Sequence, residues 1–349
     1  MTTPASAPTP VLIRGVPDDS RVQLTVDAAG NIGYAMPGTA SFLTQLRTRM
    51  APHAQLTLGP GFPVRIPGPR PGCLINYIAD ADQARLANDA AEALVDATGL
   101  PCFNHPAAVR ATTRDALARL LADVPDIDMP RTVRIRARNP ADLVAQALDA
   151  GIAFPLLVRV AGDHGGVSLA RLDSAEALDP LHGIPWGGRE LYVTEFREFA
   201  DADGRYRKMR LVVVGKRVFI RHLAIGDQWL LHADRRGPDE IDEEQAFLAG
   251  FNANVLPRLR RALVAVMQRV HLDYYGIDCS LRPDGRLLVF ELNACMNILH
   301  NSRPSPNMWD APIAAISNAL LALLATPGAW HHRPATPATQ ASATPAPSP

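Results

Sequence analysis

Two carboxylates and a carboxamide lie close together near the end of the apolar part of the sequence. Asp278 falls in an apolar run at residues 274–281, and Glu291 and Asn293 end a second run that begins at residue 286. An Asp-Gly pair between the two runs predicts a tight turn, so the segment is typical of a β-hairpin. Side chains alternate along a strand, which places Glu291 and Asn293 on one face. We expect the chemistry of the protein at this end of the hairpin.

The function of these groups depends on what neutralises them. Carboxylates in a segment otherwise suited to burial are costly unless a cation compensates them. Oxygen donors of this kind suit Mg²⁺, which binds through one or two carboxylates together with substrate phosphates. The alternative is that Asp278 or Glu291 pairs with an arginine at a polar strand end. The residues alone leave both interpretations open.

Other strands and helices must position the hairpin. Periodicity predicts a sheet-rich segment around it, with strands at 191–196, 208–214 and 218–225, a helix at 242–270 that Pro257 kinks, and a closing helix at 311–324. In the first part of the chain, the periodicity predicts a small α/β unit, with strands at 11–14, 21–26 and 73–78 and helices at 41–50 and 82–97. Between them we expect helices at 113–122 and 140–149 and strands at 132–137 and 154–160, with Asn139 as an N-cap.

One predicted strand is rich in arginine. Residues 131–138 alternate strictly, so Arg134, Arg136 and Arg138 share one face of a half-exposed strand. A solvated face is the preferred interpretation, and a phosphate-facing patch is the alternative.

Length and composition limit the classes of function. The 349 residues, 47% hydrophobic and 20% charged, predict a globular protein of about two domains and exclude a fibre or a disordered chain. The 35 basic and 35 acidic residues cancel, so neither a nucleic acid nor a membrane partner is expected. Four scattered cysteines form no C-x-x-C pair, which argues against a zinc knuckle. The lack of an apolar leader favours a cytoplasmic location, and a homodimer is the default oligomer.

Several motifs occur in an order that is found in one known family. The hairpin strings Gly276-Ile277-Asp278 and Val289-Phe290-Glu291-Leu292-Asn293 resemble the metal-binding hairpin of the ATP-grasp superfamily, in particular glutathione synthetase and the RimK-type ligases. Five other segments are similar to motifs of that family. The entry motif is matched by Asn104-His105-Pro106 with Thr113-Arg114-Asp115, and the strand start by Met129-Pro130-Arg131-Thr132. The phosphate loop is matched by residues 154–159 with the glycine-rich 161–166, the adenine hinge by residues 192–196, and the inner strand by Lys208-Met209-Arg210.

The resemblance implies an α+β protein with an α/β N-terminal domain and the ATP-grasp fold. Residues 11–100 would form the N-terminal domain and residues 101–330 the ATP-grasp domain. Two α+β lobes, at about 101–188 and 189–330, would clamp the nucleotide. The Pro/Ala/Thr-rich segments at 1–10 and 331–349 predict flexible tails.

The resemblance also implies roles for individual residues. Mg²⁺, or Mn²⁺ in its place, would be held by Asp278, Glu291 and Asn293. ATP would be bound by Arg159, Gly162, His164, Gly165, Gly166, Glu195, Phe196 and Lys208. Arg210 would stabilise the charge of the transferring phosphoryl group, and Arg221, His222, Trp229 and His232 would face the acceptor substrate.

The chain departs from the family pattern at two places. Many relatives have Asp-Lys where this chain has Asp115-Ala116, so a phosphate-binding lysine is missing unless Arg110 or Arg114 replaces it. Arg159 also stands where the family usually has a lysine. A guanidinium group suits bidentate contact with phosphate, although the two side chains are not equivalent.

The implied reaction is ATP-dependent ligation. A substrate carboxylate would be phosphorylated to an acylphosphate, and an amine would then attack it to form an amide or peptide-like bond. Three alternatives remain open at this point: an ATP-grasp kinase that stops after phosphorylation, a non-catalytic member that binds a nucleotide or peptide, and a nucleic-acid module built on residues 131–138. The last is disfavoured by the zero net charge and the lack of interleaved aromatic residues.

Overall fold

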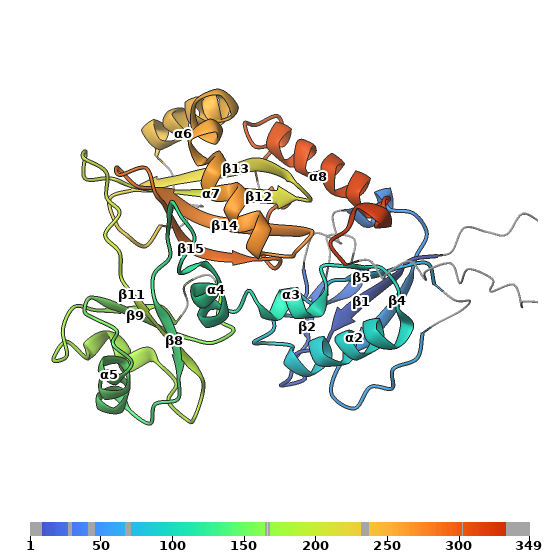
Figure 1. Cartoon of the computed structure of the whole chain (residues 1–349), viewed down its shortest axis with the longest axis horizontal. Helices are drawn as coiled ribbons and strands as arrows, with labels where there is room; N and C mark the ends of the chain where they lie inside the picture. The colour runs from blue at the N-terminus through green and yellow to red at the C-terminus, as the bar shows by residue number, and fades with distance from the viewer. Residues whose placement is uncertain are drawn as a thin grey trace, which may run out of the picture.

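Among the residues that it describes, the computed structural model has three sheets and a separate two-stranded hairpin (Figure 1). It describes residues 9–26, 30–40, 46–66, 71–164, 166, 168–231, 237–301 and 303–332. The expected helix at 41–50 lies partly outside these ranges, and its described end is a single 3-10 turn, η1 (Arg47–Arg49). In the described part of the chain, no helix combines the length and apolar character that crossing a membrane would require.

The N-terminal sheet is parallel. Its strands lie in the order β4 (Ala54–Leu58), β1 (Val11–Gly15), β5 (Leu74–Asn76) and β6 (Cys102–Phe103). Helix α2 (Arg85–Thr98) turns its small and apolar side chains towards this sheet, and a short helix, α3 (Pro106–Arg110), follows β6. The isolated hairpin of β2 (Gln23–Val26) and β3 (Ile32–Ala35) belongs to the same part of the chain.

The second sheet is small and antiparallel. Its order is β10 (Ala170–Leu172), β9 (Leu156–Val160), β11 (Leu191–Glu195) and β8 (Thr132–Ile135), and α5 (Pro140–Asp149) and η2 (Asp179–Gly183) pack beside it. The side chain of Asn139 accepts a hydrogen bond from the N–H of Asp142, as expected for an N-cap. Strand β11 pairs with β8 and β9, so this sheet includes residues that the sequence analysis put at the start of the following lobe.

The third sheet contains the hairpin that carries Asp278, Glu291 and Asn293. Its order is β13 (Arg217–Gly226), β12 (Tyr206–Val214), β14 (Tyr274–Leu281), β15 (Leu287–Asn293) and β7 (Ile127–Asp128). In Figure 1, α6 (Pro238–Gly250) and α8 (Asp310–Leu324) are drawn above this sheet, and α7 (Leu256–Arg269) crosses in front of its strands. Helix α4 (Arg114–Leu121) lies between this sheet and the small one.

The single kinked helix expected at 242–270 is divided. A π-helical turn, η3 (Phe251–Val255), separates α6 from α7, and Pro257 lies in the first turn of α7. A proline is tolerated there because the N–H groups of a first turn have no partner within the helix.

The end of the described chain packs back on the N-terminal sheet. After η4 (Pro327–Ala329), Trp330 is fully buried, and its ring meets that of Phe103 edge to face at 5.5 Å. His332 pairs with Cys102 at the edge of the sheet. One continuous apolar core joins residues of the N-terminal sheet with those of the large sheet. The mixed α+β class is confirmed, with the parallel N-terminal sheet as its α/β part.

Candidate functional site

A cavity of about 340 Å³ lies where the three sheets meet. Its walls come from the loop after β5, the start of α4, the loop between β9 and β10, the end of β11, and strands β12, β14 and β15. Most of the expected site residues line it: Arg159, Gly162, His164, Gly166, Glu195, Phe196, Lys208, Arg210, His222, Asp278, Glu291 and Asn293. Trp229 does so as well. Segments distant in the sequence therefore meet at one place.

Asp278 lies opposite Glu291 in the antiparallel pair of β14 and β15. On its other side Asp278 lies opposite Arg210 of β12, whose guanidinium group donates to both carboxylate oxygens over 2.7 and 2.8 Å. The ammonium group of Lys208 lies 3.5 Å from the same carboxylate. Asp278 is therefore buried with its charge compensated.

Glu291 has a guanidinium partner of its own. Arg114, in the first turn of α4, donates to the Glu291 carboxylate and, over 3.2 Å, to the carbonyl oxygen of Phe290. The side-chain amide of Asn293 donates to Glu291 over 3.0 Å. Burial by itself would raise the pKa of Glu291, but the charges of Arg114 and Arg159 outweigh it and hold the pKa well below its usual range. Glu291 is thus ionised near neutral pH.

The arginine pairing that the sequence left as an alternative is therefore present. The same donor set also fits a hard cation, because two carboxylates from adjacent strands and a carboxamide are oxygen donors of the kind that Mg²⁺ prefers. Within the described residues, no three His, Cys, Asp or Glu side chains are clustered as ligands of a metal. A magnesium ion here would need Asp278 and Glu291 to share or leave their arginine partners.

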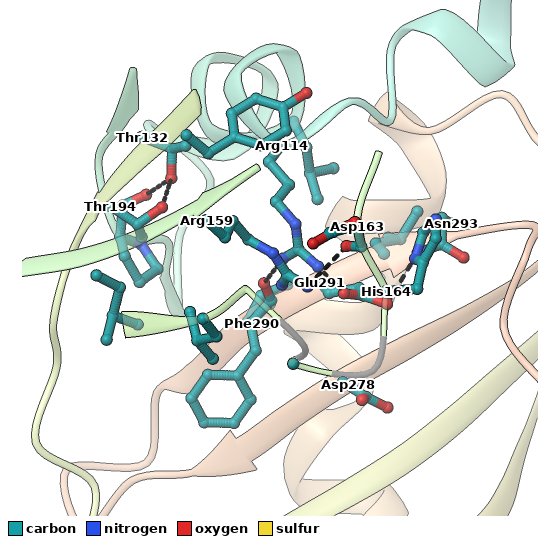
Figure 2. Close-up of a pocket in the computed structure, with 18 of the residues that line it drawn as sticks. Arg114, Thr132, Arg159, Asp163, His164, Thr194, Asp278, Phe290, Glu291 and Asn293 are labelled. Carbon is teal, nitrogen blue, oxygen red and sulfur yellow. Dashed lines mark hydrogen bonds and ion pairs between the residues drawn. The ribbon is translucent and has the colours of Figure 1, made fainter. Parts of the chain in front are cut away.

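Arg159 and Arg114 point into the cavity towards Glu291 (Figure 2). One Nη group of Arg159 donates to the carbonyl oxygen of Asp163 over 2.7 Å, while its buried Nε has no hydrogen-bond partner among the described residues. Burial and the neighbouring Arg114 lower the pKa of Arg159 to about 10, so it remains charged. A buried cation with an unused donor beside a second cation is suited to an anion such as a phosphate group.

The structure separates the two arginines considered as replacements for the missing lysine. Arg110 forms ion pairs with Asp89 and Glu92 and does not line the cavity. Arg114 lines it. Arg114 is therefore the candidate that remains.

Residues that follow β5 contact the glycine-rich loop. Gly162 and Gly166 have φ of 81° and 80°, a left-handed conformation that favours glycine. His164 forms an ion pair with Asp80 of the loop after β5, with 2.5 Å between Nε2 and Oδ2. The side-chain amide of Gln83 donates to the carbonyl oxygen of Gly162. Gly165 lies outside the described residues.

The two residues expected at an adenine ring also line the cavity. Glu195 forms an ion pair with Arg197 over 2.5 Å. The Phe196 ring lies edge to face with Trp229 at 5.7 Å, and the guanidinium group of Arg171 lies 4.0 Å from the centre of the Phe196 ring. Phe196 and Trp229 thus contribute two aromatic rings to the wall of the cavity.

Arg221 does not line the cavity, contrary to the sequence-based expectation. Its guanidinium group donates to the carbonyl oxygens of Ile298 and His300, over 2.5 and 2.8 Å. The reason is a β-bulge: Arg210 pairs with His222 and Leu211 with Ile220, so Arg221 is the extra residue and is turned towards the loop after β15. His232, the remaining acceptor candidate, lies outside the described residues.

Sequence reasoning missed a partly buried charge network beside the cavity. Arg134 donates to Asp82 over 2.6 Å, to Asp115 over 3.1 Å and to Glu190 over 2.6 Å. Neither a solvated face nor a phosphate patch describes Arg134, although Arg136 and Arg138 are largely exposed. Asp82 lies beyond the carboxyl end of a parallel strand, where functional groups of α/β sheets gather, and that position was the available signal.

Known structures share this architecture. The D-Ala:D-Ser ligase VanG from Enterococcus faecalis matches with a TM-score of 0.54 and 10% identity, over 92% of this chain and 100% of that one. The D-alanine–D-alanine ligase from Bacillus anthracis matches with a TM-score of 0.53 and 13% identity, over 92% and 97%. The same ligase complexed with ATP matches with a TM-score of 0.50, 13% identity, and coverage of 93% and 99%. No family model and no curated protein matches the sequence.

These ligases are ATP-grasp proteins. The chain therefore has the ATP-grasp fold. The sequence identity to these ligases is so low that the similarity concerns the fold alone.

Proposed function

We propose that this protein is an ATP- and Mg²⁺-dependent ligase that joins a carboxylate to an amine. The observation that carries the proposal is the convergence, in one cavity, of an oxygen donor set with buried cations. Asp278, Glu291 and Asn293 supply the donors, and Arg114 and Arg159 supply the cations. Phosphoryl transfer depends mainly on positioning and charge neutralisation, and this set of residues supplies both.

Each part of the cavity has a role in this proposal. Asp278, Glu291 and Asn293 would hold Mg²⁺, or Mn²⁺, which when bound would neutralise phosphate charge. Arg159, Lys208 and the loop at Gly162, His164 and Gly166 would bind the phosphates, while Glu195 and Phe196 would lie at the adenine. Arg210 would stabilise the transferring phosphoryl group, and His222 would face the acceptor. The ATP complex of a protein with the same fold supports the nucleotide assignment.

The reaction has two steps. An oxygen of the substrate carboxylate attacks the terminal phosphorus of ATP, and ADP leaves with the electron pair of the broken P–O bond. The nitrogen of the amine then attacks the acyl carbon, inorganic phosphate leaves, and the amine loses a proton. Closing the glycine-rich loop over the nucleotide would exclude water, which otherwise hydrolyses the acylphosphate. The substrates we propose are small-molecule or peptide carboxylates and amines.

Thermal unfolding with ATP or ADP, each with and without Mg²⁺, tests the nucleotide site, because a ligand that binds only the folded protein raises its melting temperature. We expect a Mg²⁺-dependent rise that is lost in Glu291→Gln and kept in Arg136→Gln, a surface control outside the cavity. The absence of any shift in the wild type would contradict the proposal.

Release of ADP from pairs of acids and amines then tests the reaction. A ligase requires both partners, whereas ADP release that needs no amine would identify a kinase instead. Binding of nucleotide without turnover on any pair would favour a non-catalytic protein.

A further inference from the structure

The two carboxylates of the proposed metal site each have their own arginine. Arg210 reaches Asp278 from the neighbouring strand of the same sheet, and it bonds both oxygens of that carboxylate. Arg114 reaches Glu291 from α4, a separate element. Each carboxylate therefore has one guanidinium partner, and Lys208 adds a further positive charge 3.5 Å from Asp278.

These ion pairs occupy both oxygens of Asp278 and one oxygen of Glu291, and the Asn293 amide donates to the other Glu291 oxygen, so a metal ion would compete with all of them. Both carboxylates are largely shielded from water, with side-chain exposures of 8% for Asp278 and 20% for Glu291. A cation that arrived alone would have to displace both arginines. It would also leave two charged groups without partners in a poorly hydrated place, which is costly.

A nucleotide changes this balance because it brings anions. Arg159 lines the same cavity as Arg114, and its buried Nε has no hydrogen-bond partner among the described residues. A polyphosphate lying there would accept hydrogen bonds from Arg114 and Arg210 once these groups release their carboxylates, and guanidinium groups bind phosphate as readily as carboxylate.

We propose that Arg114 and Arg210 are exchangeable counter-ions that hold Glu291 and Asp278 while the site is empty and transfer to the phosphates when metal and nucleotide enter together. The proposal rests on the proposed function, since it presumes that site. It assigns Arg114 a second role besides phosphate contact, because Arg114 blocks binding of the metal alone. Metal and nucleotide are then expected to bind with strong mutual dependence.

Binding of Mn²⁺ without nucleotide, followed by electron paramagnetic resonance, tests the proposal on the full chain. We expect weak binding to the wild type and binding tighter by at least about tenfold in Arg114→Gln, because one ion pair no longer competes. Arg114→Lys keeps the charge and should stay close to the wild type. Arg119→Gln is the matched control: it removes an arginine from the same helix whose side chain is 69% exposed and lies outside the cavity.

The same titration with ATP present completes the test. ATP should strengthen Mn²⁺ binding to the wild type by a larger factor than in Arg114→Gln. Unchanged or weaker binding of Mn²⁺ alone in Arg114→Gln would overturn the proposal, provided that the wild type binds Mn²⁺ with ATP. If the wild type binds Mn²⁺ neither alone nor with ATP, the proposed function itself fails. Should Arg114→Gln not fold, Arg210→Gln makes the same prediction for Asp278.

Discussion

Asn104 and Asp273 are joined by reciprocal hydrogen bonds. The backbone N–H of Asn104 donates to the Asp273 carboxylate over 2.8 Å, and the backbone N–H of Asp273 donates to Oδ1 of Asn104 over 2.7 Å. The Asn104 side chain also accepts from the N–H of Tyr274 and donates to its carbonyl oxygen, both over 2.9 Å. This buried joint ties the end of the N-terminal sheet to the first residue of β14, and so to the strand that carries Asp278.

Loss of this joint should lower stability. Asn104→Ala removes three side-chain hydrogen bonds and leaves buried partners unsatisfied, for an expected cost of about 3 kcal/mol in the free energy of unfolding. The φ of Asn104 is 48°, so Asn104→Gly should avoid the backbone strain and be less destabilised by roughly 1 kcal/mol. Urea unfolding measures both, and equal losses in the two variants would contradict the strain argument.

The ion pairs of Arg134 should contribute far more to the free energy of unfolding than the ion pair of Arg136. Arg134→Leu leaves the partly buried carboxylates of Asp82 and Asp115 without this cation, and we expect a loss of roughly 3 kcal/mol. Arg136→Leu removes a side chain that is 70% exposed and pairs at the surface, where a loss under about 1 kcal/mol is expected. Denaturant unfolding of the two variants checks this, and similar losses would show that the network contributes no more than a surface pair.

The ion pair of His164 and Asp80 should make stability depend on pH. Burial would lower the pKa of His164, but the hydrogen bond and charge of Asp80 outweigh it and raise the pKa above its ordinary 6.5. The stabilisation is therefore fully present below that value and is lost as the pH rises through the raised pKa. The melting temperatures of the wild type and of His164→Gln should differ most in the acidic range and converge at alkaline pH.

A matched control for this pH effect is His182→Gln, whose side chain is 81% exposed and lies away from the cavity. Thermal unfolding between about pH 5 and about pH 9 compares the three proteins. A difference between the wild type and His164→Gln that grows with pH would have the wrong sign and would exclude the ion pair as its cause.

The packing of Trp330, near the end of the described chain, against the N-terminal sheet should also contribute strongly to stability. Trp330 is fully buried, and its indole N–H donates to the carbonyl oxygen of Leu323 over 2.8 Å. Trp330→Ala should cost about 3–5 kcal/mol through the cavity it leaves. Trp330→Phe keeps most of the side-chain volume and should cost less. Calorimetry of both variants measures the effect, and unfolding of Trp330→Ala at the wild-type temperature would refute the packing argument.

Local sequence determined the hairpin of β14 and β15 and the start of α5. Alternation and the Asp-Gly turn specify β14 and β15 because they depend only on neighbours along the chain, and Asn139 with Pro140 specifies the start of α5 for the same reason. The order of motifs determined the fold, which the structural matches confirm. The metal and nucleotide roles remain predictions.

Only the tertiary structure decided which charges meet. Arg114 and Glu291 are 177 residues apart, and Asp80 and His164 are 84 apart, so no local pattern relates them. The bulge that turns Arg221 away from the cavity depends on the register between β12 and β13, since one extra residue redirects a side chain. Periodicity specifies the face of a strand, whereas the partner of a charge depends on how separate elements pack, and that packing brought the arginines to the carboxylates of this site.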